Sequence, residues 1–577
     1  MNQTLAAIFE QMAAIMEILG VDRFRINSYS RVARMLGDLN DDIAEIGPDV
    51  KELQKLPGIG KGTAARIAEF LETGEMEDWT DLREQIPDGL LDLLNIPGLG
   101  PKKISLMWNE AGVESLSDLK EKLEGDEISS LPGMGKKTVE NLKKSIAFAE
   151  ASGGRVRIGV ALETALWFID QFADMKEVKK LEYAGSLRRG KETIGDVDLL
   201  VAADTKHAEK ITDRFKSLEP VTDVLVSGQT KTSVRTTDNI QVDMRIIDPK
   251  NFGAALMYFT GSKEHNIRMR ERAIKQGASL NEYALTNSET KDVIASETEE
   301  DVYKALGLKW IAPEMREDRG EIDLAEKDEL PKLIEPEDIA AELHAHTTAS
   351  DGKWSIEELA TACAERGFHT VAVTDHSKGQ AQANGLDEKR LEKHIKEIRK
   401  VAERMKGDIN ILAGSEVDIL ATGKLDYADS LLEQLDIVVA SPHAALGQDP
   451  DKATTRLVKA IENPFVTIIG HPTGRLINRR EGLSPDMKKI IAAAKDRGIA
   501  LEINANDWRL DLRDTHARAA IESGVKLAIN TDAHGPTHLP LIVYGVLTAR
   551  RAGATKNDVV NCMTKAALTK WLKSTRD

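Results

Sequence analysis

The chain is poor in cysteine, with only Cys363 and Cys562 among its 577 residues. Two thiols so far apart are too few for a disulfide framework or for a cysteine-based zinc site. Both occur in apolar surroundings with helical spacing. We therefore predict that each is a core thiol.

Long hydrophobic runs are also missing. No apolar stretch approaches the roughly 18 residues that a membrane-spanning helix needs, and the N-terminal MNQTLAAIFEQMAAIMEILG lacks a basic leader and a small-residue cleavage site. With 41% hydrophobic and 30% charged residues, the composition is that of a globular protein. We expect several domains, no membrane partner and a cytoplasmic location.

An excess of basic residues is lacking as well, since the net charge is −17. Residues 1–150 carry 17 Lys and Arg against 27 Asp and Glu. Nucleic acid could bind this part only through local donors and local basic clusters. We expect weak nonspecific affinity that falls as salt rises.

The most informative stretch is YAGSLRRGKETIGDVDLLV, residues 183–201. Asp196 and Asp198 are two positions apart in an apolar run, so in a β-strand they point to the same face. Two carboxylates that close repel each other unless a divalent cation lies between them. The Gly185–Ser186 turn before them suits a phosphate, which backbone N–H groups, a hydroxyl and a guanidinium can bind.

A third candidate carboxylate is Asp243, in the strand-like run NIQVDMRII. Alone, this residue fits a surface strand equally well. Together, three carboxylates, two Mg²⁺ ions and a triphosphate form a two-metal centre for phosphoryl transfer.

The N-terminal region contains an internal repeat: LPGIGKG from Leu56, IPGLGPK from Ile96 and LPGMGKK from Leu131. Each copy is a Gly-x-Gly bend before an amphipathic helix, where backbone N–H groups at a helix N-terminus can bind a DNA phosphate. The repeat resembles the helix-hairpin-helix motif. A packing role is the alternative for any single copy. The predicted DNA-binding glycines are Gly58, Gly60, Gly98, Gly100, Gly133 and Gly135.

The chain resembles the family X DNA polymerases of the nucleotidyltransferase superfamily in two stretches. They are GSLRRG followed by GDVD, and YFTGSKEHNIRMR at 258–270. The resemblance implies four regions. They are an N-terminal helical domain that binds a DNA 5′-phosphate (1–80), a DNA-binding subdomain with two further hairpin motifs (81–150), an α/β catalytic palm (151–250) and a nucleotide-selection subdomain (251–320).

The same resemblance implies roles for single residues. Asp196, Asp198 and Asp243 hold two Mg²⁺ or Mn²⁺ ions, and Asp243 accepts the proton of the primer 3′-hydroxyl. Tyr258 and Phe259 pack under the sugar, with core aromatics as the alternative. The implied nucleotide-binding residues are Ser186, Arg189, Gly261, Tyr258, Phe259, Lys263, Asn266 and Arg270, and Arg25 and Tyr29 are implied DNA contacts.

The sequence departs from the family pattern in several places. Arg66 stands where members with lyase activity have a Schiff-base lysine, and guanidinium is too basic for that role. Gln241 stands where the family usually has an arginine, two residues before the third carboxylate. Lys263 stands where some relatives have an acidic residue. We expect 5′-phosphate binding without lyase activity of the usual kind.

Residues 316–340 are acidic, interrupted by proline and without hydrophobic period, which is typical of a linker. We place the linker proper at 321–340. After residue 340 histidine becomes frequent, with ten of the twelve histidines.

These histidines occur in clusters, each closing a short β-branched apolar run, with helical stretches between clusters. A repeated order of strand, ligand-bearing loop and helix predicts a parallel β/α barrel with the ligands at its C-terminal rim. Nine His, Asp and Glu side chains there suit Zn²⁺ or Mn²⁺: His344, His346, Asp351, His376, Glu416, His443, His471, Asp532 and His534. We expect His369, His394, His516 and His538 to be structural.

This second half resembles the polymerase and histidinol phosphatase (PHP) domain, a distorted (β/α)7 barrel, here at 341–577. The resemblance implies up to three metal ions. One is held by His344, His346, Glu416 and Asp532, a second by Glu416, His443 and His471, and a third by Asp351, His376 and His534. No family ligand is missing, which indicates an active metal-dependent phosphoesterase.

The combined prediction is a monomeric DNA polymerase that uses deoxynucleoside triphosphates to fill short gaps in DNA repair, including base excision repair. Its barrel would act as a 3′–5′ exonuclease or 3′-phosphoesterase. One alternative is a DNA-end-processing enzyme with a weak or vestigial polymerase centre. Another is a small-molecule phosphatase barrel on a nonenzymatic scaffold, against which the three hairpin repeats weigh.

Overall fold

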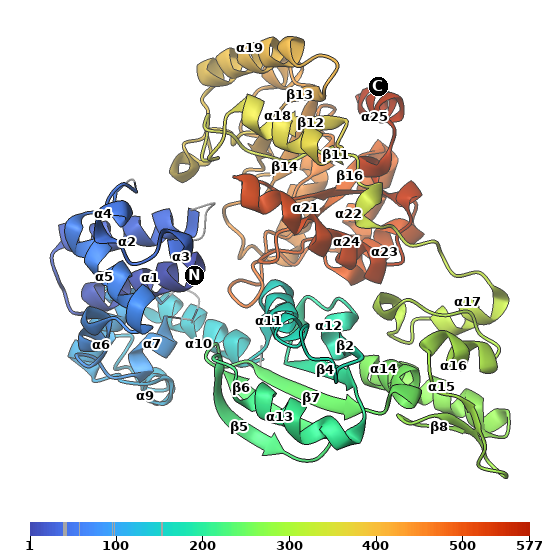
Figure 1. The fold of residues 1–577 in the computed structure, drawn as a ribbon. Helices are drawn as coiled ribbons and strands as arrows, with labels where there is room; N and C mark the ends of the chain where they lie inside the picture. The colour runs from blue at the N-terminus through green and yellow to red at the C-terminus, as the bar shows by residue number, and fades with distance from the viewer. Residues whose placement is uncertain (39–42, 57, 95, 97–98, 152–153, 577) are drawn as a thin grey trace. The chain divides into compact units, whose positions relative to one another are not determined.

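The computed structural model describes residues 1–38, 43–56, 58–94, 96, 99–151 and 154–576. Gly98, one of the predicted DNA-binding glycines, lies outside these residues. The chain divides into two compact units, residues 1–154 with 478–480 and residues 155–477 with 481–577 (Figure 1). None of the described helices is long and apolar enough to cross a membrane.

All named secondary-structure elements in the described residues of the first unit are helices. The unit has two buried clusters, one around Met12, Leu36 and Ile67 and one around Leu90 and Ile104. The first helix supplies residues to both clusters, so the two predicted N-terminal regions share it. The helices are α1 (Asn2–Ile18), α2 (Arg23–Asp38), α3 (Ile43–Ile46), α4 (Val50–Leu53), α5 (Lys61–Thr73), α6 (Glu77–Arg83), α7 (Gly89–Leu93), α8 (Pro101–Ala111), α9 (Leu116–Leu123) and α10 (Lys136–Ala151).

The same backbone hydrogen bond occurs in all three copies of the sequence repeat. The N–H group of the residue between the two glycines donates to the carbonyl three residues earlier: Ile59 to Leu56 at 3.2 Å, Leu99 to Ile96 at 3.0 Å and Met134 to Leu131 at 3.0 Å. Gly58 has a φ of 83°, which glycine adopts without steric cost. The helices α5, α8 and α10 begin directly after these turns. Each helix therefore begins where the repeat predicts, although Pro101 at the start of α8 has no N–H to donate.

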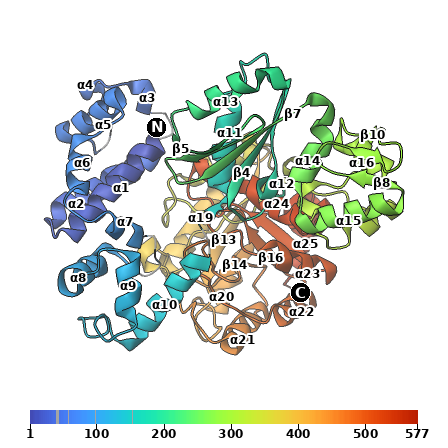
Figure 2. The ribbon, with the colours of Figure 1, turned by 90° about the horizontal axis from the view of Figure 1, so that it is seen from below.

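The region predicted to be the palm (151–250) contains a five-stranded mixed sheet in the order β2-β4-β7-β6-β5, of which Figure 2 labels β4, β5 and β7. Its neighbours β4 and β7 are parallel, and the other pairs are antiparallel. The strands are β2 (Lys180–Tyr183), β4 (Asp196–Ala202), β5 (Val221–Ser227), β6 (Lys231–Thr236) and β7 (Gln241–Ile247); β1 (Val156–Arg157) and β3 (Thr193–Ile194) form a separate pair.

Alternation along β4 decides which face carries the acidic residues. Val197, Leu199 and Val201 pack in one buried cluster with α11 (Ile158–Asp170) and α13 (Ala208–Lys216). Leu200 and Ala202 pack on the opposite side with α14 (Phe252–Thr260). Asp196 and Asp198 share the parity of Leu200, so they lie on the α14 side of the sheet.

The region after the palm packs its own cluster around Met269, Tyr303 and Leu306. Its elements are α15 (Lys263–Lys275), β8 (Ala278–Leu280), β9 (Leu285–Asn287), β10 (Val293–Ala295), α16 (Glu299–Ala305) and α17 (Glu321–Lys327).

The segment 316–340, where we expected a linker, contains helix α17 (Glu321–Lys327) and several buried side chains. Arg316 is fully buried, Glu321 is 2% exposed and Ile334 is buried. Arg316 pairs with Glu299 at 2.6 Å, and Glu321 accepts a hydrogen bond from His265 at 2.7 Å. Arg316 and Glu321 therefore have partners that are distant in sequence, and these contacts hold the segment in place.

The C-terminal barrel consists of seven parallel strands in sequence order. Past the ends of the first and last strands, Ala345 and Ala533 form a parallel bridge, and His346 N donates to Ala533 O at 2.8 Å. The predicted distorted seven-unit barrel is thereby confirmed. The strands are β11 (Ala341–Glu342), β12 (Thr370–Val373), β13 (Asn410–Asp418), β14 (Ile437–Ser441), β15 (Ile468–Ile469), β16 (Ala500–Asn504) and β17 (Lys526–Asn530).

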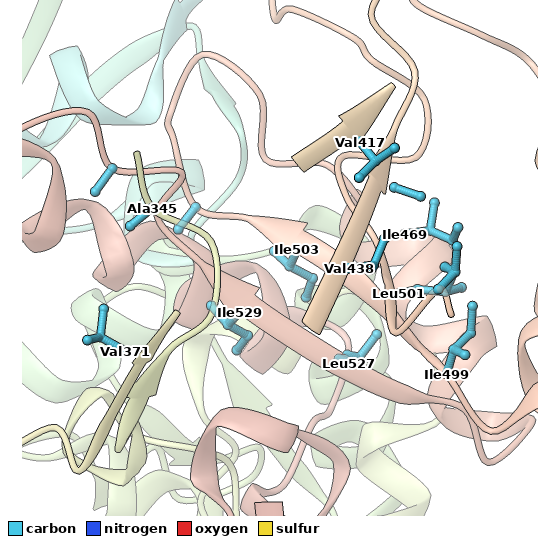
Figure 3. Packing of buried hydrophobic residues seen from close by; sticks show 14 of the residues in the cluster. Ala345, Val371, Val417, Val438, Ile469, Ile499, Leu501, Ile503, Leu527 and Ile529 are labelled. Atoms are coloured by element: carbon cyan, nitrogen blue, oxygen red, sulfur yellow. The ribbon is translucent and has the colours of Figure 1, made fainter. Parts of the chain in front are cut away.

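Helices connect these strands and cover the barrel. Figure 3 shows apolar side chains of the strands that belong to one buried cluster, such as Val438, Ile469 and Leu501. The helices are α18 (Ile356–Glu365), α19 (Glu388–Arg404), α20 (Asp429–Leu432), α21 (Pro450–Ile461), α22 (Met487–Arg497), α23 (Asp514–Glu522), α24 (Ile542–Arg551) and α25 (Lys565–Ser574).

Palm and barrel pack directly on each other within the second unit. Ile477, Leu510 and Tyr544 of the barrel belong to the buried cluster of the palm. Arg475 donates two hydrogen bonds to Glu192, at 3.0 and 2.6 Å. The two folds therefore share apolar core as well as polar contacts.

Candidate active sites

The structure brings the three palm carboxylates together. Asp198 on β4 is in direct register with Asp243 on the parallel strand β7. One oxygen from each of Asp196, Asp198 and Asp243 lies within 4.8 Å of the others. This arrangement can hold divalent cations, because hard cations prefer oxygen ligands and cancel the repulsion between carboxylates.

The three carboxylates have different electrostatic surroundings. Burial and the neighbours Asp196 and Asp243 raise the pKa of Asp198 to about 7. Burial alone would also raise the pKa of Asp243, but hydrogen bonds from Lys231 and Gln241 hold it below its usual value. Lys231 Nζ lies 2.7 Å from Asp243 Oδ2, and Gln241 Nε2 donates to Oδ1 at 2.9 Å. Close carboxylates that raise each other's pKa are the surroundings expected of a cation site.

The turn before β4 approaches these carboxylates closely. Gly185 has a φ of 62°, and a Cβ added there would lie 2.3 Å from Asp198 Oδ2, so only glycine fits. The following residues form the short helix α12 (Gly185–Arg188). The predicted phosphate site and metal site are therefore adjacent in space as well as in sequence.

The two arginines of this turn are already engaged. Arg188 forms a two-pronged ion pair with Glu299, at 2.8 and 2.9 Å. Arg189 donates from Nε to Glu317 at 3.0 Å and from Nη1 to the carbonyl of Thr260 at 2.5 Å. Neither Glu299 nor Glu317 was singled out from the sequence, because acidic residues in helical or loop segments carry no signal of their own.

The other predicted nucleotide-binding residues lie on α14, α15 and the turn between them. Tyr258 and Phe259 are half-buried, with ring centroids 5.2 Å apart, and Arg245 lies over the Phe259 ring. Asn266 Nδ2 donates to Tyr258 O at 2.7 Å, while its buried Oδ1 has no hydrogen-bond partner among the described residues. Lys263 and Arg270 are exposed, Ser186 is half-buried and Gly261 is buried.

The nine predicted barrel ligands converge at the carboxyl ends of the strands. Glu416 lies at the centre, within 3.6 Å of a ring nitrogen of each of five histidines: His344, His346, His376, His443 and His471. Three sets of ligand atoms lie close enough to hold a metal: His344, His346, Glu416 and Asp532; His376, Glu416 and His443; and His346, Asp351, His376 and His534.

This grouping differs from the predicted one in two sets: His376 stands in place of His471 in the second, and His346 joins the third. His471 Nε2 instead contacts Glu416 Oε1 at 2.8 Å. His376 takes part in two sets because Nδ1 lies 2.8 Å from Glu416 and Nε2 lies 3.7 Å from Asp351.

Several buried atoms of the barrel site have no hydrogen-bond partner among the described residues, among them His344 Nε2, His346 Nε2 and Asp532 Oδ1. Buried polar atoms of this kind are costly unless they are paired or bind an ion. Burial, His534 and His376 together lower the pKa of His346 to about 4, which leaves its ring neutral. The neutral ring is the form that binds a metal. These residues therefore fit metal ions.

A second layer of carboxylates orients the ligands, and it was missed in the sequence. Glu502 on β16 is fully buried and lies 2.7 Å from His344 Nδ1. Asp418 on β13 lies 2.5 Å from His443 Nδ1. Such contacts fix the ring so that Nε2 points at the site. An acidic residue inside an apolar strand was the signal that could have revealed them.

In the first unit, Arg25 is exposed, but Tyr29 is 8% exposed and packs against Phe9 at 5.6 Å. Arg66 forms an ion pair with Asp78 and lies over the Tyr29 ring. Tyr29 therefore belongs to the core of this unit, with little surface to offer a ligand.

Among the residues expected to be structural, His369 and His394 have polar partners in Met563 O and Asp375, at 2.8 and 2.7 Å. Cys363 is buried and Cys562 is partly buried, and both are free thiols.

Four family models match the chain. They are a helix-hairpin-helix domain at residues 1–76, a SAM-like helix-hairpin-helix tandem at 90–147, the DNA polymerase beta thumb at 255–317 and the PHP domain at 342–506.

Known proteins resemble the whole chain or its parts. The DNA polymerase/3′-5′ exonuclease PolX of Bacillus subtilis is 37% identical over 574 residues, 99% of each chain. A probable phosphatase of Thermoanaerobacter sp. (strain X514) is 30% identical over 234 residues, 39% of this chain and 90% of the phosphatase. DNA polymerase lambda of Rattus norvegicus is 25% identical over 343 residues, 55% of this chain and 56% of that polymerase. The chain therefore belongs to the family X DNA polymerases that carry a PHP domain.

Proposed function

We propose that the protein is a DNA-directed DNA polymerase that fills short gaps in DNA repair, and that its barrel hydrolyses phosphoesters at DNA 3′ ends as an exonuclease or phosphatase. The observation that carries the first half is the convergence of Asp196, Asp198 and Asp243 within 4.8 Å, beside the turn at Gly185. The full-length likeness to a polymerase with exonuclease activity supports both halves.

In the palm, Asp196, Asp198 and Asp243 would hold two Mg²⁺ or Mn²⁺ ions, which would supply charge stabilisation for phosphoryl transfer. Asp243 accepts the proton of the primer 3′-hydroxyl. Lys231 and Gln241 keep this carboxylate ionised and fix its orientation, which supports its role as the base.

The incoming deoxynucleoside triphosphate lies along Ser186, Arg189, Gly261 and Lys263, with Tyr258 and Phe259 under its sugar. Asn266, whose Nδ2 donates to Tyr258 O, would face the base edge. Arg270 is exposed and contacts the template strand.

DNA is bound through the hairpin turns of the first unit and through Arg25. The N–H groups at the starts of α5, α8 and α10 take phosphates without requiring net positive charge. We further propose that the protein acts on gapped DNA as a monomer in the cytoplasm.

In the barrel, the nine ligands would hold up to three Zn²⁺ or Mn²⁺ ions, which would activate water and polarise the phosphoester. Glu502 and Asp418 orient His344 and His443. Because every predicted ligand is present and converges, we assign hydrolytic activity to this site.

A one-nucleotide gap in duplex DNA with a 5′-phosphate tests the proposal directly. We expect insertion of the complementary nucleotide with Mn²⁺ or Mg²⁺, and shortening of the primer when triphosphates are omitted. Parallel substrates ending in a 3′-hydroxyl or a 3′-phosphate separate exonuclease from phosphatase. Shortening without any extension would replace the polymerase with a DNA-end-processing enzyme.

A further inference from the structure

Glu317 lies where three parts of the second unit meet. One of its oxygens, Oε1, accepts hydrogen bonds from Arg189 of the palm turn and from Arg551 of the barrel helix α24, both at 3.0 Å. Its other oxygen, Oε2, lies 3.7 Å from Lys191 Nζ. The Glu317 side chain is only 10% exposed. One carboxylate therefore connects the palm turn to the barrel.

The contacts of Arg189 leave one edge of its guanidinium available. Nε is held by Glu317 and Nη1 by Thr260 O. No described residue accepts a hydrogen bond from Nη2. Two contacts in one plane fix a guanidinium rotationally, and the remaining donors suit a phosphate oxygen.

The barrel holds Glu317 firmly in place. Arg551 is 5% exposed, and besides Glu317 it donates to the backbone carbonyl of Arg189 at 2.6 Å and to Asp514 at 2.9 Å. Burial raises the pKa of Glu317, but Arg551 and Arg189 lower it further than burial raises it, so the carboxylate is ionised. Moving a buried charged group away from its partners costs a large amount of free energy, so Glu317 should stay in this position.

We propose that Glu317 is a positioning residue for nucleotide binding: anchored by Arg551 of the barrel, it holds Arg189 so that the Nη2 edge faces the incoming triphosphate. The barrel thereby contributes to the polymerase site without touching the nucleotide. This inference rests on the proposed polymerase function and on the assignment of Arg189 to the triphosphate.

The same contact permits the opposite role, in which Glu317 occupies Arg189 and competes with the triphosphate. The two roles predict opposite changes in nucleotide affinity when the carboxylate is removed. Positioning predicts weaker binding, and competition predicts tighter binding.

The test uses the full chain and single-nucleotide insertion into a one-nucleotide gap, with KM for the nucleotide and kcat measured separately. The variants are Glu317→Gln, which keeps the side-chain shape, Glu317→Ala and Arg551→Gln. We expect KM to rise about 10-fold in Glu317→Ala and Arg551→Gln, while kcat changes less. Hydrolysis of 3′ ends should remain at the wild-type rate.

Glu314→Gln is the matched control. Glu314 pairs with Arg550 at 2.7 Å, is 7% exposed and joins the same segment to the same helix α24, one residue from Arg551. No described contact links it to Arg189. Its KM should stay at the wild-type value, which separates positioning from general loosening of the interface.

The double variant Glu317→Ala with Arg551→Gln tests whether Arg551 acts through Glu317. If Arg551 acts through Glu317, the double variant has the KM of Glu317→Ala alone, because effects along one chain of contacts are not additive. An unchanged or lowered KM in Glu317→Gln and Glu317→Ala, or additive effects, would overturn the proposal. If the wild-type protein inserts no nucleotide at all, the proposed polymerase function fails as well.

Discussion

Asp198 and Asp243 are paired in register across the parallel strands β4 and β7, and Asp198 lies against the Gly185 turn on its other side. The register places two carboxylates from segments 45 residues apart in the sequence on one face of the sheet. Since a shift by one residue would turn Asp243 to the opposite face, the pairing itself creates the site.

Metal binding at the palm should release protons near neutral pH. The pKa of Asp198 is about 7 without an ion, so roughly half of these carboxyl groups carry a proton at pH 7. A cation requires the ionised form, so Mn²⁺ should displace about half a proton per site at pH 7 and almost none at pH 8.5. Calorimetry in buffers of different ionisation enthalpy measures this release, in a His344→Ala, His346→Ala background that weakens the barrel site. Equal release at both pH values would contradict the raised pKa, and Asp198→Asn provides the control.

Removing Lys231 should shift the pH dependence of polymerisation. Lys231 lowers the pKa of Asp243 through a hydrogen bond and the pKa of Asp198 through its charge, so Lys231→Met raises both pKa values and metal binding then requires a higher pH. The acid limb of the pH–rate profile should move up by about 0.5 pH unit, the size expected of a partly exposed ion pair. Lys231→Arg keeps the charge and should restore the wild-type limb. A profile that does not move in Lys231→Met would show that this cation has no influence on the titration of the palm carboxylates.

Loss of Glu502 should impair only the barrel. This residue lies 2.7 Å from His344 Nδ1 and so fixes the ring that presents Nε2 to the site. Removal of such an outer contact typically costs 10–100-fold in metal affinity or activity. We expect Glu502→Gln to lower 3′-end hydrolysis in that range while nucleotide insertion stays unchanged. Glu403→Gln, at an exposed position on α19, is the control. An equal loss of both activities would point to damage to the fold instead.

Glu299 should be important for stability. Its carboxylate, 4% exposed, pairs with Arg188 and with the fully buried Arg316. Glu299→Ala leaves both guanidiniums without their partner, which should cost about 3–5 kcal/mol in local unfolding. Hydrogen exchange of the α16 amides measures this loss, and Glu300→Ala, at the exposed neighbouring position, should cost under about 0.5 kcal/mol.

The stability that Glu299 contributes through its two arginine partners should depend on pH. The two arginines outweigh burial and hold the pKa of Glu299 far below its usual value. Its contribution is therefore fully present above the unfolded pKa of about 4.3 and is lost as pH falls toward the folded pKa. The difference in protection between wild type and Glu299→Gln should shrink below about pH 4. A difference that is constant with pH would contradict this sign.

The sequence predicted some of these features directly. Asp196 and Asp198 were assigned to one face because a strand has a period of two, and the barrel ligands were found because each follows a short apolar run. The partnership of Asp243 with Asp198 depends on which strands pair, which periodicity does not reveal.

Other features depend on packing between distant segments. The segment 316–340 resembles a solvated linker by composition, yet Arg316 and Glu321 are buried against Glu299 and His265. Glu502 resembles any strand residue until the fold places it beside His344. Charges neutralised by partners far along the chain carry no local signal.

The central claim is that one chain contains two separate catalytic centres. One assay tests it most directly: a one-nucleotide-gapped duplex with a labelled primer, Mn²⁺ and a time course with and without triphosphates. The proteins compared are wild type, Asp196→Ala with Asp198→Ala, and His344→Ala with His346→Ala. We predict that the first pair abolishes extension and leaves shortening, and that the second pair does the reverse. Loss of both activities in either variant, or extension that survives without the palm aspartates, would contradict the account.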